Sequence, residues 1–201
     1  MSTKERHASR ATAWLKARIR EIGSSSVDIY FQGVLAWCLA ASADLLSNLQ
    51  RDVQIECDDD VAAVLAPLVS ALEDDASWAR AVETTHWALV CRFSAVNWPD
   101  AYDDTIEVAK IALGPPPETA DVLLLTANFQ EDDDGDPDGL SGEGRFVFSM
   151  ARHGYQAAVG EDPPIDVLHE LTSWWMSAYD EASDFLVEHL TATFPDGPPP
   201  N

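Results

Sequence analysis

The feature that most constrains the fold of this chain is its longest apolar stretch, residues 29–43, which is interrupted by Gln32 and Gly33. Apolar residues lie nearly all round a helix that Asp28 can cap and that runs to about Gln50. This pattern is typical of a helix buried on most sides. The stretch is shorter than the roughly 20 apolar residues that span a bilayer. We therefore expect a buried central helix and no membrane span.

Apolar residues at three- and four-residue spacing predict one helix before this segment and another after it. The first covers about residues 3–22, ends at Gly23, and is amphipathic and basic. The second covers residues 98–113 and opens with Pro99, because proline is favoured at the first position of a helix. Both segments have one clear apolar face, so both should pack against the core.

Three consecutive carboxylates, Asp58, Asp59 and Asp60, precede another apolar stripe. Carboxylates are favoured at the positive end of a helix, so a helix should begin here, and Pro67 predicts a kink inside it.

The strongest periodicity lies near the end of the chain, where a helix over residues 164–191 is predicted. Its stripe consists of Leu168, Leu171, Trp175, Ala178, Ala182, Phe185 and His189. This helix is expected to organise the fold. The tail at 195–201 is rich in proline and glycine and should be disordered.

Two regions are ambiguous between helix and strand. Residues 77–96 favour a helix but contain many strand formers, and residues 121–129 and 145–159 alternate as a small sheet would, with Gly154 as a hairpin turn. The polar segment 131–144 is expected to be a loop. The predicted fold is a mainly α, compact domain of about six to eight helices, with a two- or three-stranded β element left open and an α+β fold as the alternative.

The net charge of −23 is unevenly distributed. Residues 1–22 carry six basic and two acidic side chains, a net +4, which leaves −27 for the remainder. We therefore divide the chain into a basic helix (1–23), an acidic globular body (24–194) and a tail (195–201). Such a body repels phosphate backbones and anionic lipid, so direct binding of nucleic acid or membrane is not expected.

The acidity also has a simpler explanation, because many bacterial proteins are acidic for solubility. Three lysines against nine arginines fit a GC-rich genome equally well. The cysteines, Cys38, Cys57 and Cys91, form no CxxC pair, and the start of the chain shows no secretion signal. We expect buried thiols, a reducing compartment and a cytoplasmic protein.

A metal site is suggested by the alternating carboxylates Asp134, Asp136 and Asp138, which resemble the opening of a calcium loop of the EF-hand kind. The twelfth position of that loop should be a bidentate glutamate, but here it is Arg145. A solvated acidic loop is the alternative interpretation, and no cofactor is expected beyond calcium or magnesium at this place.

Asp100, Asp103, Asp104 and Glu107 lie within two helical turns and share one side of the predicted helix. Aspartates at such spacing bind magnesium in the aspartate-rich helices of terpene and prenyl synthases, but the order here is DxxDD and no second motif is visible. Carboxylates in the first turn of a helix are also favoured by its dipole.

No motif for catalysis is found: the sequence contains no GxSxG, HExxH or phosphate-binding loop. His86 lies on an apolar stripe and is expected to be a core histidine. The leading hypothesis is a non-enzymatic acidic protein that masks a basic surface on another protein, as an immunity protein or a DNA-mimicking inhibitor does. Its expected contact residues are Asp58, Asp59, Asp60, Asp180, Asp184 and Glu188. A structural or adaptor subunit and a metal-dependent enzyme or metal-binding module are the alternatives.

Overall fold

The computed structural model describes residues 3–55, 59–117 and 142–173. These residues are mainly helical and contain no β-strand, which confirms the expected mainly α fold. The elements are α1 (Thr3–Gly23), α2 (Ile29–Ile55), α3 (Asp59–Ala71), α4 (Asp75–Asn97), the short 3-10 helix η1 (Pro99–Ala101), α5 (Tyr102–Leu113), α7 (Gly142–Val159) and a helix over residues 165–173.

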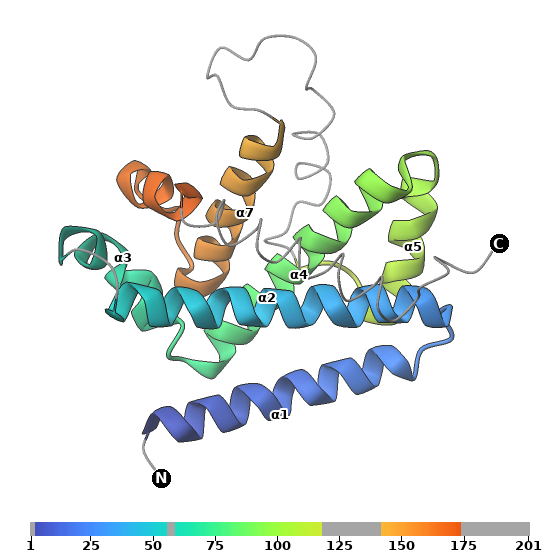
Figure 1. Cartoon of the computed structure of the whole chain (residues 1–201), viewed down its shortest axis with the longest axis horizontal. Helices are drawn as coiled ribbons and strands as arrows, with labels where there is room; N and C mark the ends of the chain where they lie inside the picture. Colours follow the sequence, from blue (N-terminus) through green and yellow to red (C-terminus); the bar gives the residue numbers. More distant parts are fainter. Residues whose placement is uncertain (1–2, 56–58, 118–141, 174–201) are drawn as a thin grey trace.

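The apolar helix α2 lies at the centre of the fold. Figure 1 shows α1 running along one side of α2, α5 and α7 on the other side, and α4 crossing α2. The helices α1, α3 and α4 all pack against α2. Its fully buried side chains are Val34, Leu35, Cys38, Leu39, Leu46 and Leu49. The expected burial on most sides is therefore confirmed, because partner helices cover this apolar surface.

The turn before α2 is held by polar side chains. The Asp28 carboxylate accepts hydrogen bonds from the backbone N–H groups of Tyr30, at 2.8 Å, and Phe31, at 3.4 Å, as expected of a cap. The Gln32 amide donates to the carbonyl oxygens of Ser25, at 3.0 Å, and Val27, at 2.6 Å. Gln32 therefore interrupts the apolar run because it fixes the connection between α1 and α2.

Within the described ranges, one segment, Ile29–Leu49, is long and apolar enough to cross a membrane. Its mean hydropathy is 1.4, and 61% of its most apolar window is buried inside the protein. Length and composition alone make a weak case for a span, since the core helix of a soluble protein passes the same test. The packing of α2 against its neighbours is compatible with a soluble protein.

The basic helix α1 packs onto the body through its apolar face. Ile22 is 2% exposed, and Trp14, Leu15 and Ile19 are partly buried against the core. The Trp14 ring meets that of Trp78 in α4 edge to face, with centroids 5.4 Å apart. This arrangement accounts for the apolar stripe of α1, because aromatic pairs of this geometry contribute beyond the area they bury.

The ambiguous segment at 77–96 is helical and belongs to α4, as favoured. The Asp74 side chain caps this helix by accepting a hydrogen bond from the Ser77 N–H at 2.9 Å. The helix packs against both α2 and α7 and buries Ala81, Val82, Trp87, Ala88 and Val90. Strand formers are tolerated here because packing outweighs their modest helix penalty.

The strand interpretation of 145–159 is wrong, because helix α7 covers residues 142–159. Gly154, the expected hairpin turn, lies buried inside this helix. Ala151, Tyr155 and Ala158 lie three and four positions apart and are all buried. This helical spacing prevails over the alternation of Phe146, Phe148 and Met150, and residues 142–144 of the expected loop are helical too.

The remaining sequence expectations are tested only in part. Pro67 lies exposed inside the continuous helix α3. Of the predicted helix at 164–191, residues 165–173 are helical and bury Val167, Leu168 and Leu171. The segments 121–129, 131–141 and 174–201 lie outside the described residues.

Candidate acidic binding surface

Most of the carboxylates proposed from sequence fall outside the described part of the chain. These are Asp58, Asp134, Asp136, Asp138, Asp180, Asp184 and Glu188. Asp59 and Asp60 are the first two residues of α3, as expected for carboxylates at a helix start, and their side chains are likewise not described. The calcium-loop hypothesis and the partner contacts at these positions therefore remain predictions.

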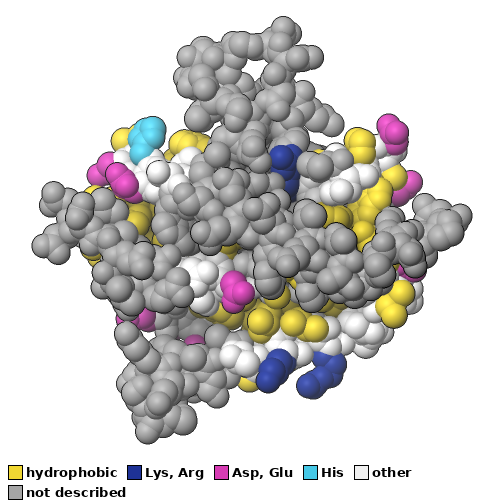
Figure 2. Space-filling view, viewed as in Figure 1, with side chains coloured by type: hydrophobic (Ala, Val, Ile, Leu, Met, Phe, Trp, Pro, Cys, Tyr) yellow, Lys and Arg dark blue, Asp and Glu magenta, His cyan; other side chains and the backbone are white. Residues whose placement is uncertain are grey.

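The densest acidic surface among the described residues lies at the start of α5. We call Asp100, Asp103, Asp104 and Glu107 the α5 acidic face; all four side chains are exposed. Opposite them, Ile106 and Ala109 are buried in the core. Burial of that apolar side turns the carboxylates outwards, and Figure 2 shows acidic side chains at the end of the molecule where Figure 1 places α5.

An aromatic cluster positions this face. The ring of Trp98, which lies between α4 and η1, meets Phe93, Phe31 and Tyr30 edge to face, with centroids 5.3, 5.8 and 6.3 Å away. The backbone N–H of Trp98 also donates a hydrogen bond to the backbone carbonyl oxygen of Ser94 at 2.9 Å. Trp98 thus fixes the end of α4 and the start of η1 against the first turn of α2.

Backbone bonds then set the direction of α5. The Ala101 N–H donates to the Trp98 carbonyl at 3.1 Å, and the Thr105 hydroxyl donates to the Ala101 carbonyl at 2.8 Å. No side chain caps the first turn, where Asp103 and Asp104 lie. Negative charge is favoured at this end of a helix, so part of the acidity has a structural reason.

The charge of the face is only partly neutralised. Glu107 forms an ion pair with Lys110 at 2.5 Å, whereas Asp100, Asp103 and Asp104 form none with the residues that the structure describes. Ile111, 65% exposed, lies one turn beyond Glu107 on the same side. Carboxylates beside one exposed aliphatic group suit a lysine or arginine side chain, whose charged end and apolar stem can both be contacted.

The magnesium hypothesis for these four carboxylates finds no support. Among the described residues, no three or more histidine, cysteine, aspartate or glutamate side chains are grouped so that they could hold a metal ion. Carboxylates spread along the outer side of one short helix reach outwards rather than converging. The arrangement therefore suits a broad basic surface better than a single cation.

Two other carboxylates of the described structure, Asp74 and Asp162, serve the fold. The hydrogen bond from Ser77 lowers the pKa of Asp74, which caps α4. After α7, Asp162 accepts two hydrogen bonds from the Arg152 guanidinium, at 2.8 and 3.1 Å, and one from Gln156 at 2.5 Å. The bond from Arg152 is the main reason that the pKa of Asp162 is lowered. Asp74 and Asp162 thus have hydrogen-bond partners within the fold, whereas Asp100, Asp103 and Asp104 form no ion pair with the described residues.

The buried titratable groups are unsuited to acid–base or nucleophilic work. The His86 Nε2 lies 2.8 Å from the Leu35 carbonyl oxygen, and burial lowers the pKa of His86 to about 4. Burial raises the pKa values of Cys38 and Cys91 to about 12. His86 is thus the core histidine expected from its position, and both thiols are held protonated.

Comparison of the chain with known protein families, curated proteins and solved structures found no match.

The sequence predicts the α5 carboxylates as candidate metal ligands and not as a surface that binds a partner protein. The spacing of Ile106 and Ala109 was the available signal, since it predicts which side of the helix is buried.

Proposed function

We propose that this protein is a non-enzymatic acidic binding protein that masks a basic surface on another protein, with the α5 acidic face as one contact surface. The observation that carries this proposal is the exposure of Asp100, Asp103 and Asp104 without ion pairs to the described residues. The fold fixes the backbone segment that carries these carboxylates, because Trp98 is packed against three other rings. Preorganised charge loses little conformational entropy when it binds.

Net charge supports the same function. A total of −23 speeds the approach of a cationic partner, because electrostatic steering raises association rates by about 10- to 1000-fold. Nucleases present basic surfaces to DNA or RNA, and the negative charge of this protein attracts such surfaces. An inhibitor of the immunity-protein or DNA-mimic type, acting in the bacterial cytoplasm, is the specific form that we propose.

The test compares the wild type with a variant in which Asp100, Asp103 and Asp104 are each changed to Asn. Binding to a panel of basic nucleases is measured by surface plasmon resonance at low and at physiological salt, together with nuclease activity. We expect at least one nuclease to bind and lose activity. We expect its association rate to fall about tenfold in the variant at low salt, because three steering charges are gone.

A matched control removes the same number of charges elsewhere, at Glu161, Asp166 and Glu170, which are also exposed. Equal losses in both variants would show that net charge acts without a contact at α5. Absence of binding to every basic nuclease at low salt would refute the proposal.

The adaptor alternative is favoured by one observation: Lys16 and Arg20 of α1 are exposed. An adaptor would bind through this basic helix and not through α5. Changing Lys16 and Arg20 to Ala distinguishes the two, since loss of assembly with a partner by a folded variant, while the α5 variant still assembles, favours the adaptor.

A further inference from the structure

The two sides of α1 have different roles. Its apolar side is used in the core, where Ile22 is buried and Trp14 meets Trp78. Lys16 and Arg20 lie one turn apart on the other side and are exposed. Figure 2 shows basic side chains along the edge of the molecule that α1 forms in Figure 1. We call Lys16 and Arg20 the outer face of α1.

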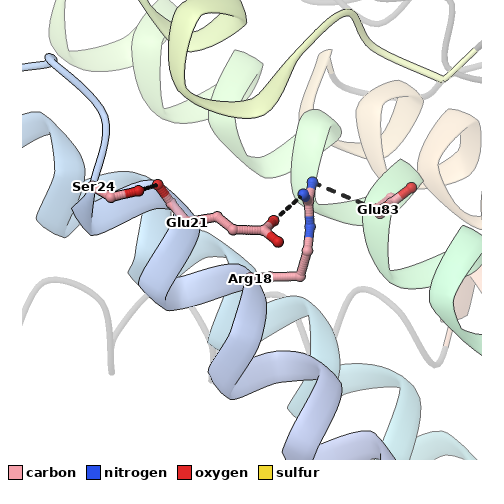
Figure 3. A network of polar contacts seen from close by, with 4 residues as sticks. All are labelled: Arg18, Glu21, Ser24 and Glu83. Atoms are coloured by element: carbon pink, nitrogen blue, oxygen red, sulfur yellow. Dashed lines mark hydrogen bonds and ion pairs between the residues drawn. The ribbon is translucent and has the colours of Figure 1, made fainter.

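A third basic residue of α1, Arg18, differs from Lys16 and Arg20 because its charge is paired within the protein. Arg18 forms ion pairs with Glu21 in its own helix, at 2.6 Å, and with Glu83 in α4, at 3.7 Å (Figure 3). Its side chain is about half as exposed as that of Glu21, 29% against 59%. Lys16 and Arg20, in contrast, form no ion pair with the described residues.

The packing of α1 limits the kinds of molecule that its outer face can bind. A basic amphipathic helix binds a bilayer by burying its apolar side among the lipids, but here the core occupies that side. The acidic body also opposes extended anionic surfaces such as membranes and nucleic acid. A compact acidic surface with discrete carboxylates is the remaining match, and the α5 acidic face of another copy is such a surface.

We propose that the outer face of α1 in one copy binds the α5 acidic face of a second copy. Lys16 and Arg20 lie one turn apart on α1, and Asp100 of η1 and Asp104 of α5 are four positions apart in the sequence, so two cations can face two carboxylates across the contact. Lys16, Arg20, Asp100 and Asp104 are all exposed and form no ion pair with the described residues. The contact uses the α5 acidic face of the proposed function but does not depend on that function, and a basic partner would compete with it.

Salt gives the contact a distinctive signature. Two chains of net charge −23 repel each other when the Debye length is about 30 Å, at about 0.01 M salt. At about 0.15 M the Debye length is about 8 Å, so mainly the charges that face each other across the contact interact. At about 1 M these are screened as well. Association should therefore be strongest at intermediate salt.

The experiment is analytical ultracentrifugation of the pure, full-length protein. Exposed ion pairs make a weak interface, so we expect dissociation constants on the order of 0.1 to 1 mM. The average mass should rise above 22.0 kDa with concentration at intermediate salt and return towards 22.0 kDa at high salt.

Charge reversal identifies the surfaces. The variant K16E/R20E and the variant D100K/D104K should each remain monomeric, because each then presents like charges across the contact. An equimolar mixture should associate again, since the acidic α1 of the first variant matches the basic α5 of the second. The charge-conserving control K16R/R20K should associate like the wild type.

Circular dichroism melting must show that all variants are folded. A wild type that stays monomeric throughout, association that persists in either reversed variant, or folded variants that do not associate when mixed would each overturn the proposal. Binding of the wild type to phosphatidylserine vesicles through Lys16 and Arg20, without self-association, would overturn it as well. None of these results bears on nuclease binding, so the failure of this inference and that of the proposed function are separable.

Discussion

The buried His86 predicts a specific loss of stability in mild acid. Its Nε2 lies 2.8 Å from the Leu35 carbonyl oxygen, so the neutral ring donates this hydrogen bond inside the core. Desolvation by burial is the main cause that lowers the pKa of His86 from 6.5 to about 4, and the positive charge of Arg18 lowers it further. The folded protein therefore resists a proton that the unfolded chain accepts readily.

The sign and size follow from linkage between protonation and folding. Below pH 6.5 the unfolded chain takes up the proton first, so the free energy of unfolding decreases as the pH falls towards 4. A pKa lowered from 6.5 to about 4 corresponds to a loss of about 3 kcal/mol over this window. Below about pH 4 the contribution of His86 is lost completely and no further decrease arises from it.

The measurement is urea unfolding of the wild type and of His86→Gln at several pH values between 7 and 4. The glutamine keeps an N–H donor for Leu35 but does not titrate, so the variant should lose about 3 kcal/mol less than the wild type on acidification. Comparing the two cancels the contribution of the many carboxylates. His169→Gln, at an exposed position, is the control and should behave like the wild type. Parallel pH profiles for the wild type and His86→Gln would refute the reasoning.

Three other predictions concern the core. Leu49→Ala, at a position that is 0% exposed, should cost about 2–5 kcal/mol in urea unfolding, whereas Ile29→Ala, at a position 73% exposed, should change stability by less than about 0.5 kcal/mol. Ser94→Ala should stabilise the protein by up to about 1 kcal/mol, because the Ser94 hydroxyl is buried without a hydrogen-bond partner in the described structure; a lowered melting temperature would contradict this. Peptides containing Cys38 and Cys91 should stay unlabelled by iodoacetamide at pH 8 until the protein is denatured, since burial raises both pKa values to about 12; rapid native labelling would show that these thiols are accessible.

Helical segments with one-sided apolar patterns were predictable from sequence because their periodicity depends only on local order. The boundaries of α1 and the opening of η1 at Pro99 agree with the expectation, and the Asp28 cap is confirmed by its bonds to Tyr30 and Phe31. A strand was a possible prediction for the α7 segment because Phe146, Phe148 and Met150 alternate with other residues over a short distance. Its helical face becomes visible only when Ala151, Tyr155 and Ala158 are seen to be buried together.

The α5 acidic face, too, could be predicted only in part from the sequence. Carboxylate spacing at the start of α5 was visible in the sequence, and it favoured a solvated helix face over a metal site. The buried side of α5 could be predicted from the spacing of Ile106 and Ala109, and the ion pair between Glu107 and Lys110 is local, since these residues are three positions apart. The packing of α5 against α4 and α1 joins residues far apart in the chain and leaves no local pattern.

What the sequence by itself determined is therefore the class of the fold, the uneven charge, and the burial of α2 on most of its sides, because apolar residues lie nearly all round this helix. The tertiary structure alone decided which charges are used within the fold. Arg18 lies beside Glu83 because α1 packs across α4, whereas Lys16 and Arg20 on the same helix point away from the core. Charge is a property of each residue, but whether it is paired depends on the distance to its neighbours, and only the packing of the helices sets that distance.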